Sequence, residues 1–579
     1  MKSNIKDKIL FEFNNSNFKE AYNLAINTAQ IKNNDFILKI LTISSFKIQK
    51  YSDSVKFGLN LLNLIDSKND IQILYILGTS YSILKDFDNG NKYLKQYLSI
   101  EPQNIAVQYN LGLNLFNQKK FEESKIYFSE INSKKNGYRN SELLYGIIQS
   151  EIKNYKNAIN IFKKLINKKK FIIESYYNLG IVYQKIKKYE LSIKFLKKSI
   201  NEDNQQHQFF NSLGISYQKL FKYKEARTYY EQAIKLNNNY SKAYSNLGYL
   251  LEKNGFFEEA IKKFDIALKY NPDDREILYN KSICLLEHGN FIEGLKLYKW
   301  RQNGKYLNSD FFKLNEIQNK KIFISSDQGL GDIILQSRFV KLLADYGAQV
   351  TFQIPQSMQQ LLKNLDDKIN ITTSQITKNN FDYSCELGDL FKIFNIDISN
   401  IPLSESYLNI DKKWIKKWQN KLNKKNFNIG IVWQGKNGEP VDEGRSFKLK
   451  NFENISKIKN IQLISLQKNY GEEQIKIFNE KNNIINFSDI LDVKAKFMDS
   501  AGLMKNLDLI ISSDTSIVHL AGALGVKTWL LLQKYPFWYW HVKDQYSIWY
   551  DNVKIFKQDE NHNWKKLFAK IENELIKSR

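Results

Sequence analysis

The sequence comprises 579 residues, of which 42% are hydrophobic, and it carries a formal net charge of +25. A chain of this length is too long for one hydrophobic core, and its apolar content excludes wholesale disorder. The two cysteines, Cys284 and Cys385, exclude a disulfide framework and a cysteine-rich zinc cluster. No run approaches the roughly 18–20 apolar residues that span a bilayer, and the N-terminus lacks the apolar core of a signal peptide. We therefore expect a soluble, cytoplasmic protein.

The positive charge first suggests a nucleic-acid partner, because phosphate binding needs clustered lysine and arginine. The sequence contains only seven arginines, however, and arginine is the residue that reads bases and phosphates in bidentate geometry. The remaining positive charge is lysine, scattered among asparagine and isoleucine. This distribution indicates solvated helix faces, so we expect no nucleic-acid partner.

A 34-residue period runs through the first half of the chain. Its clearest marker is a glycine that recurs six times in register, at Gly78, Gly112, Gly146, Gly180, Gly214 and Gly248. A small residue follows each glycine after twelve positions, at Gly90, Ser124, Ala158, Ser192, Ala226 and Ala260. A large apolar or aromatic residue follows four positions later, at Leu94, Phe128, Phe162, Leu196, Tyr230 and Phe264. Periods of this length are typical of stacked helical hairpins.

The period resembles that of the tetratricopeptide repeat (TPR) family. We expect about eight repeats over residues 1–305, forming an α-solenoid. The small residues are expected where helices cross closely, and the large ones in the groove between neighbouring repeats. A ladder of Asn178, Asn211 and Asn246 on the concave surface could hydrogen-bond an extended peptide, or could simply reflect the asparagine-rich composition.

The pattern changes after residue 305. Residues 321–326 predict a buried strand, 328–332 a glycine turn, 333–346 a helix and 349–354 the next strand. This order of strand, turn, helix and strand opens a doubly wound sheet. We assign residues 306–425 to a first Rossmann-like lobe, the acceptor lobe, which ends in an amphipathic linker helix.

A second Rossmann-like lobe, the donor lobe, is expected over residues 426–579. Its predicted strands are 428–433, 461–466, 507–512 and 526–532; a helix over 517–524 follows the third of these, and another helix ends the chain. Two doubly wound lobes in series place a ligand cleft at the carboxyl ends of both sheets.

Three segments together resemble a known family, in which TPR repeats are fused to a heptosyltransferase-like glycosyltransferase domain of the GT-B fold. The segments are 327–332 (DQGLGD), 430–435 (GIVWQG) with Arg445 and Ser446, and 513–525 (SDTSIVHLAGALG). The TPR-linked O-GlcNAc transferases are more distantly similar. This chain departs from these relatives at Ser516, where heptosyltransferases usually carry glycine, and at Tyr539, where related TPR proteins often carry arginine.

The third segment predicts a site for the diphosphate of a nucleotide sugar. Asp514, Thr515 and Ser516 open a helix whose first N–H groups and dipole favour an anion, and His519 lies one turn further along. The alternative is that Asp514 or Ser513 is a plain N-cap and that His519 is an ordinary helix residue.

Two basic residues, Arg445 and Lys468, lie on predicted loops that face the cleft, where either could neutralise the leaving diphosphate. Gly435 belongs to the same donor-binding set. Three tryptophans could stack on a base or sugar, or could belong to the core: Trp433, Trp538 and Trp540.

The resemblance implies that Asp332 is the general base, on an acceptor-side turn formed by Gln328, Gly329 and Gly331. The competing role for Asp332 is to cap the helix, and a carboxylate at a helix N-terminus stays ionised but is a weaker base. The sequence shows no metal-binding cluster. We therefore expect an enzyme that is independent of metal and needs no cofactor beyond its nucleotide-sugar substrate. The resemblance to the GT-B family implies that it is inverting, which the sequence alone does not distinguish from retaining.

The resemblance implies a glycosyltransferase that moves a sugar from a nucleotide sugar to a protein acceptor, such as flagellin or another surface protein, held by the concave TPR surface. One alternative is a TPR interaction scaffold whose transferase domain is inactive. Another is a transferase acting on a lipid-linked or polysaccharide glycan, with the lysine-rich surface making peripheral membrane contact.

Overall fold

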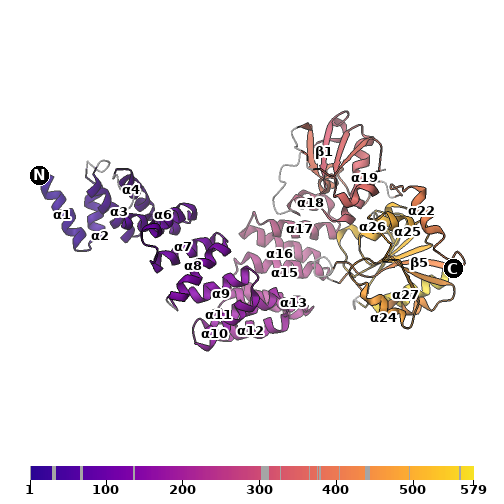
Figure 1. Ribbon diagram of the computed structural model, residues 1–579, viewed down its shortest axis with the longest axis horizontal. Coiled ribbons are helices and arrows are strands. Elements are labelled where there is room, and N and C mark those ends of the chain that lie inside the picture. Colours follow the sequence, from indigo (N-terminus) through magenta and orange to yellow (C-terminus); the bar gives the residue numbers. More distant parts are fainter. Residues whose placement is uncertain are drawn as a thin grey trace. The chain divides into compact units, whose positions relative to one another are not determined.

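The computed structural model describes thirteen ranges of the chain, drawn as ribbon in Figure 1. They are residues 2–28, 34–64, 70–134, 137–301, 312–326, 328–363, 365–374, 376, 380–402, 405–436, 444–493, 496–559 and 563–578. Asp327, the first residue of the predicted acceptor-side segment, lies outside them. The chain divides into two compact units, Met1–Asn238 and Asn239–Arg579.

The first unit consists of helices that pair as successive hairpins (Figure 1). They are α1 (Lys2–Asn14), α2 (Phe18–Ile26), α3 (Asp35–Lys47), α4 (Tyr51–Leu64), α5 (Ile71–Ile83), α6 (Phe87–Ile100), α7 (Ile105–Asn117), α8 (Phe121–Lys134), α9 (Ser141–Glu151), α10 (Tyr155–Asn167), α11 (Ile172–Lys185), α12 (Tyr189–Glu202), α13 (His207–Lys219) and α14 (Tyr223–Leu236). Four more repeat helices open the second unit: α15 (Ser241–Lys253), α16 (Phe257–Tyr270), α17 (Arg275–Glu287) and α18 (Phe291–Leu297). The described ranges therefore contain eighteen repeat helices, which make nine hairpins. This is one hairpin more than the eight repeats expected.

The repeat glycines make room for the large residue of their own hairpin. A Cβ on Gly180 would lie 2.6 Å from Leu196 Cγ, and one on Gly112 would lie 3.2 Å from the Phe128 ring. The small residue packs at the same crossing, where Ser124 Oγ donates a hydrogen bond to the Gly112 carbonyl (2.7 Å). The large residues also pack between repeats, as expected: Phe128 shares a core cluster with Leu144 and Ile148 of the next hairpin, and Phe162 shares one with Leu179 and Val182.

The predicted asparagine ladder is not a uniform surface. The Asn178 amide donates to the Glu174 carbonyl of its own helix (2.7 Å), and Asn211 is buried with 6% of its surface exposed. Asn246 lies half-buried in the second unit. These residues therefore do not present equivalent amides to a peptide.

The first α/β lobe contains a four-stranded parallel sheet in the order β3-β2-β1-β4. Its elements are η3 (Leu314–Glu316), β1 (Lys321–Ser325), α19 (Leu330–Asp345), β2 (Gln349–Gln353), η4 (Gln356–Met358), α20 (Gln359–Leu362), β3 (Ile369–Thr372), β4 (Tyr383–Glu386), η6 (Leu387–Asp389) and α21 (Leu390–Ile393). Helix α22 (Lys412–Gln419) then leads into the second lobe. The predicted β1, α19 and β2 are confirmed within a few residues.

The second α/β lobe contains an eight-stranded sheet in the order β10-β11-β12-β9-β8-β5-β6-β7, parallel from β12 to β7. Its elements are β5 (Phe427–Val432), η8 (Leu449–Phe452), α23 (Glu453–Ser456), β6 (Ile461–Ser465), α24 (Glu473–Asn479), β7 (Ile484–Asn486), α25 (Met498–Met504), β8 (Leu509–Ser512), α26 (Ser516–Ala523), β9 (Thr528–Leu532), η9 (Trp538–Trp540), β10 (Val542–Lys543), β11 (Tyr546–Ser547), β12 (Val553–Lys557) and α27 (Trp564–Lys577).

Both faces of this sheet are buried, which explains the nearly continuous apolar runs of its strands. On β5, Ile429 and Ile431 point into a core shared with Ile571 of the terminal helix α27. Val432 points to the opposite face, into the core that contains Leu520 of α26. The alternation follows from the two-residue period of a strand.

The last two repeat hairpins pack tightly on the two lobes. The Trp538 ring of η9 lies 5.5 Å from Phe291, 5.8 Å from Tyr298 and 5.2 Å from Phe391, centroid to centroid. Tyr298 begins η2 (Tyr298–Arg301), which ends the array. The boundary between compact units therefore falls inside the repeats, at 238/239, and not where the sequence pattern changes near residue 305.

This packing predicts how the chain can be divided. A fragment of residues 239–579 should be monodisperse by size-exclusion chromatography and melt cooperatively by circular dichroism. A fragment of residues 301–579 loses Phe291 and Tyr298, and removal of one such buried aromatic side chain costs on the order of 3–5 kcal/mol. It should aggregate or melt without cooperativity. Equal melting temperatures for the two fragments would show that the hairpins contribute nothing to the lobes.

Candidate functional site

A cleft of about 930 Å³ lies between the two lobes, at the carboxyl ends of their parallel strands. Its walls come from the loops after β1, β5, β6, β8 and β9, with α17 and η2 of the last repeat at one side. Eleven of the twelve residues predicted for the site line it: Gln328, Gly329, Gly331, Asp332, Gly435, Arg445, Lys468, Asp514, Thr515, Ser516 and His519. This is the location expected for a ligand between doubly wound lobes.

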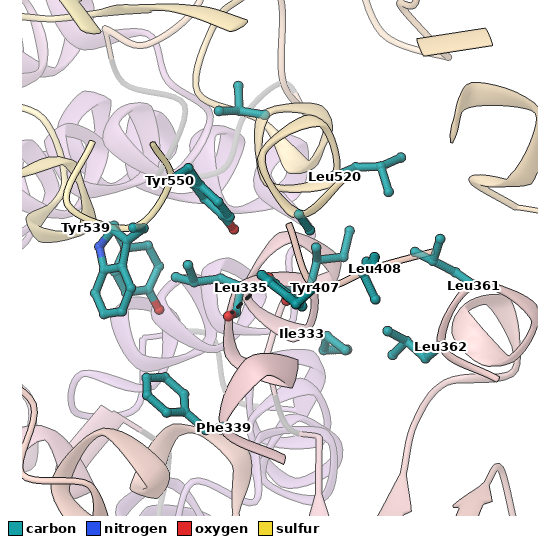
Figure 2. Packing of buried hydrophobic residues seen from close by; sticks show 14 of the residues in the cluster. Ile333, Leu335, Phe339, Leu361, Leu362, Tyr407, Leu408, Leu520, Tyr539 and Tyr550 are labelled. Carbon is teal, nitrogen blue, oxygen red and sulfur yellow. Dashed lines mark hydrogen bonds between the residues drawn. The ribbon is translucent and has the colours of Figure 1, made fainter. Parts of the chain in front are cut away.

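The first turns of α19 and α26 meet across the cleft. A Cβ on Gly331 would lie 2.9 Å from His519 Cδ2 and 3.3 Å from Ser516 Cα, so only glycine permits this approach. Deeper in the seam, Figure 2 shows Leu335 and Phe339 of α19 on one side of the apolar core and Leu520 of α26 on the other. Because the helices cross closely, their N-termini lie next to each other at the cleft.

Among the described residues, the N-cap side chain of helix α26 makes no capping hydrogen bond. Its N-cap residue is Thr515, whose backbone is extended (φ −145°, ψ 170°) and whose side chain makes no capping hydrogen bond. The alternative of Asp514 or Ser513 as N-cap is therefore not what the structure shows. An uncapped helix start that faces a cleft can bind an anion through its first N–H groups.

Asp514 and Arg445 lie together beside this helix start. Burial raises the pKa of Asp514, while the Arg445 guanidinium and a hydrogen bond with the Trp540 side chain act in the opposite direction. Arg445 lies across the backbone of Gly435, where a Cβ would come within 2.8 Å of Nη2. The guanidinium thus lies against Gly435, whose own N–H donates to Ser446 Oγ (3.1 Å).

The Lys468 side chain is held against the cleft wall that the second lobe forms. Its Nζ donates to the carbonyls of Ser488 (2.6 Å) and Leu491 (3.1 Å), so the ammonium is held at the cleft edge. Lys436 and Lys496 line the same wall and are exposed. Together with Arg445 they make this half of the cleft electropositive.

Gln467 shapes the donor-lobe wall and was missed by sequence reasoning. Its side chain is 3% exposed; its Oε1 accepts from the N–H groups of Trp433 (3.0 Å) and Gln434 (3.1 Å), and its Nε2 donates to the carbonyls of Gln434 and Tyr470 (both 2.7 Å). This buried amide joins the loops after β5 and β6. A polar residue at the end of an apolar strand was the only signal for it.

His519 is a neutral group of the cleft. Burial, aided by Arg338, lowers the pKa of His519 to about 3. Its Nδ1 is hydrogen-bonded with the Tyr550 hydroxyl (3.2 Å), and its ring stacks on Trp540 with centroids 5.0 Å apart. His519 can therefore hydrogen-bond a ligand, but it contributes no positive charge at neutral pH.

Asp332 occupies the first turn of α19. The Gly329 N–H donates to its Oδ2 (3.1 Å), which is a capping interaction. The charge of Asp332 adds to the burial that raises the pKa of the Tyr539 hydroxyl. The side chain also faces the cleft. The structure therefore shows the capping contact and leaves room for the catalytic role.

The three tryptophans predicted as stacking platforms are core residues. Trp433 is fully buried, and its Nε1 donates to the Gly471 carbonyl (3.2 Å). Trp538 and Trp540 are each 1% exposed. The donor-binding assignment of Trp433 is thereby corrected, because strand alternation turns its ring into the core behind the sheet.

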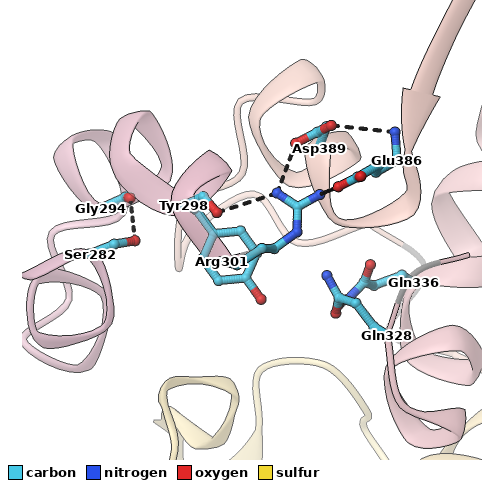
Figure 3. A network of polar contacts seen from close by, with 8 residues as sticks. All are labelled: Ser282, Gly294, Tyr298, Arg301, Gln328, Gln336, Glu386 and Asp389. Atoms are coloured by element: carbon cyan, nitrogen blue, oxygen red, sulfur yellow. Dashed lines mark hydrogen bonds and ion pairs between the residues drawn. The ribbon is translucent and has the colours of Figure 1, made fainter. Parts of the chain in front are cut away.

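The last repeat contributes to the cleft, which sequence reasoning also missed. Arg301 forms buried ion pairs with Glu386 (2.8 Å) and Asp389 (2.9 Å) of the first lobe (Figure 3). It lines the cleft together with Tyr279 and Tyr298. The scarcity of arginine was a usable signal, because a buried, bidentate ion pair favours arginine over lysine.

Two further properties hold for the described residues alone. None of their helices is both long enough and apolar enough to cross a membrane. None of their histidine, cysteine, aspartate and glutamate side chains group in a way that could hold a metal ion.

The repeat half of the chain matches a known family. Residues 71–104, 173–206, 207–240 and 245–299 match the tetratricopeptide repeat. The chain is 21% identical over 282 residues to the protein FlbA of Caulobacter vibrioides, an alignment that covers 44% of this chain and 46% of FlbA. The chain thus spans about half the length of this curated relative.

Solved structures of repeat proteins are also similar. A TPR protein from Parabacteroides merdae is 13% identical, with a TM-score of 0.39, and the match covers 43% of this chain and 97% of that one. YrrB, described as a TPR protein with an unusual peptide-binding site, is 20% identical with a TM-score of 0.25 and covers 31% and 93%. The matches to the repeat family agree with the helical hairpins and the glycine period, and the chain therefore contains tetratricopeptide repeats.

Proposed function

We propose that this chain is a glycosyltransferase that transfers a sugar from a nucleotide sugar to a hydroxyl group of a protein acceptor. The observation that carries the proposal is a cleft in which the start of α26, Arg445 and Lys468 of one lobe face a carboxylate, Asp332, of the other. We infer that the two lobes form a GT-B arrangement, in which donor and acceptor meet between the sheets.

The donor-lobe wall suits a diphosphate. The first N–H groups of α26 point a positive dipole end into the cleft, and the hydroxyls of Thr515 and Ser516 add donors. Arg445 offers a planar guanidinium and Lys468 a fixed ammonium. Such groups stabilise the charge that develops on a leaving diphosphate without a metal ion.

The reaction is a single displacement. The acceptor oxygen forms a bond to the anomeric carbon while its proton moves to the Asp332 carboxylate. The bond between the anomeric carbon and the diphosphate oxygen breaks at the same time, and its electron pair leaves with the nucleoside diphosphate. Attack opposite to the leaving group inverts the anomeric configuration, as the resemblance to the heptosyltransferases implies.

The repeats suggest the class of acceptor. TPR arrays bind peptides and proteins through their concave surfaces. In this chain the last repeat carries Tyr279 and Arg301 to the edge of the cleft itself. A protein held by the last repeats would therefore lie beside the site.

A protein-interaction scaffold without catalysis is the second candidate. The observation that favours it is the hydrogen bond from the Gly329 N–H to Asp332, because capping alone would account for an aspartate at this position. The matched family also supports interaction and is silent on chemistry.

Loss of Arg445 tests the donor wall. Arg445→Ala should weaken the binding of a nucleoside diphosphate about 10- to 100-fold, since a hydrogen bond to a charged group contributes about 1.5–3 kcal/mol. Titration calorimetry with UDP, GDP, ADP and CDP measures this. Arg227→Ala is the matched control, because Arg227 is an exposed arginine of α14 paired with Glu231 (2.9 Å). Unchanged affinity in Arg445→Ala would remove Arg445 from the site.

The Asp332→Asn substitution distinguishes a role of Asp332 as general base from a role as helix cap. An asparagine can still accept the Gly329 N–H bond, so stability should fall by at most about 1 kcal/mol. Transfer should fall roughly 10²–10⁴-fold with donor affinity unchanged. The control is Asp345→Asn at the other end of α19, where Asp345 pairs with Lys341 (3.7 Å). Turnover above about a tenth of the wild-type rate would show that Asp332 is not the base.

A further inference from the structure

The turns between the two helices of each hairpin lie along one edge of the repeat array, because successive hairpins stack in the same direction. In the first compact unit, three consecutive turns of this kind are basic: residues 152–156 (IKNYK), 186–190 (IKKYE) and 220–224 (LFKYK). They join α9 to α10, α11 to α12 and α13 to α14. They contain six lysines and one carboxylate, Glu190, and all six lysines are exposed. We call these three turns the basic edge.

The carboxylates that flank the basic edge leave it positive. Glu151, which precedes the first turn, forms an ion pair with Lys185 (2.8 Å). Glu190 and Glu225 lie in the first turns of α12 and α14, where a negative charge interacts favourably with the helix dipole. Neighbouring turns lie roughly 10 Å apart, the packing distance of adjacent helices. This exceeds the screening length of about 8 Å at physiological ionic strength, so the lysines of different turns repel one another only weakly.

The backbone of the basic edge indicates that its side chains are not imposed by the turns. Lys153, Lys187 and Phe221 occupy the same turn position and have φ values of 65°, 60° and 58°. This left-handed region favours glycine and tolerates asparagine, and a bulky residue in it is strained. The same array places glycine there in two later turns, at Gly255 (φ 79°) and Gly289 (φ 90°). Strain of this kind concentrates at functional sites, which points to a use for the side chains.

Two earlier turns do not belong to the basic edge. They also carry lysine in the left-handed conformation, at Lys85 (φ 65°) and Lys119 (φ 60°). Carboxylates lie beside these lysines in the sequence, however, at Asp86, Asp88, Glu122 and Glu123. The excess of positive charge is therefore confined to the three turns from residue 152 to residue 224.

Phe221 places a large apolar ring among the lysines. It is 57% exposed, and its ring contacts Tyr223 edge-on with centroids 6.2 Å apart. An exposed ring between lysines fits the interface of a membrane, where the ring enters the headgroup region and the lysines reach the phosphates. A nucleic acid would instead favour arginine for its phosphates and a series of rings for its bases, whereas the basic edge contains no arginine and one exposed aromatic ring.

We propose that the basic edge is a docking surface for a membrane rich in anionic phospholipid. The six lysines contact the phosphate headgroups, and Phe221 inserts between them. This inference does not rest on the proposed transferase activity.

The test measures how the full-length chain co-sediments with vesicles of phosphatidylglycerol and phosphatidylcholine mixed equally, and with vesicles of phosphatidylcholine alone. The chain should bind the anionic vesicles, and high salt should weaken the binding. The double variant Lys153→Asn with Lys187→Asn should weaken it about 25-fold, since each lysine near an anionic surface contributes about 5-fold. Phe221→Asn should weaken it on the order of 10-fold at low and at high salt alike. Asparagine tolerates the left-handed conformation, so the melting temperature of these variants should not fall.

The double variant Lys169→Asn with Lys170→Asn is the matched control. Both lysines are exposed, and Lys169 has the same left-handed conformation (φ 55°), but they lie at the other end of α10. The control should bind anionic vesicles like the wild type. An equal loss in the control would show attraction to total charge and overturn the assignment to the basic edge. Absence of binding to the anionic vesicles at low salt would overturn the membrane as partner, as would binding to polyuridylic acid alone.

Discussion

The arrangement of the cleft depends on one buried cation, Arg338. This residue of α19 is fully buried; its guanidinium donates to the carbonyls of Leu335 (2.9 Å) and Trp549 (2.8 Å), and it lies over the rings of Tyr407 and Tyr550, each 4.8 Å from the ring centroid. A charge without such partners would be too costly to bury. Because Trp549 and Tyr550 belong to the second lobe, these contacts hold α19 against that lobe and bring the α19 and α26 termini together.

Arg338 also affects the protonation of its neighbour His519. Arg338 adds to the burial that lowers the pKa of His519, so the helix that offers its N-terminus to an anion carries a neutral ring one turn in. The positive character of the cleft therefore comes from the edge, from Arg445 and Lys468, and from the α26 dipole. A diphosphate would be held at the rim of the second lobe, while the point where the helices cross stays neutral. In the proposed reaction, that separation would place positive charge beside the leaving group and keep it away from the carboxylate opposite.

The sequence predicted the elements that have strong periodicity. The glycine period located the hairpins, and the apolar runs located β1, β5, β6, β8 and β9. The sequence could not show where the Trp433 side chain points. The pattern around a tryptophan that follows a strand is the same whether its ring faces a ligand or the core. The sequence also could not place the compact-unit boundary, because Phe291 and Tyr298 satisfy the repeat pattern and only the fold shows that they pack on Trp538. Residues that act through long-range contacts, such as Gln467 and Arg338, leave no local pattern.

The two roles considered for Asp332 are compatible. A carboxylate has about four acceptor positions, so the hydrogen bond from Gly329 does not exhaust its capacity to take a proton. A hydrogen bond donated to a carboxylate favours the ionised form and so makes it a weaker base. In the proposed reaction this loss would be offset if the same bond fixed the oxygen that faces the acceptor, since correct placement of a reacting group can be worth about 7–11 kcal/mol. The cap would then orient the base as well as begin the helix.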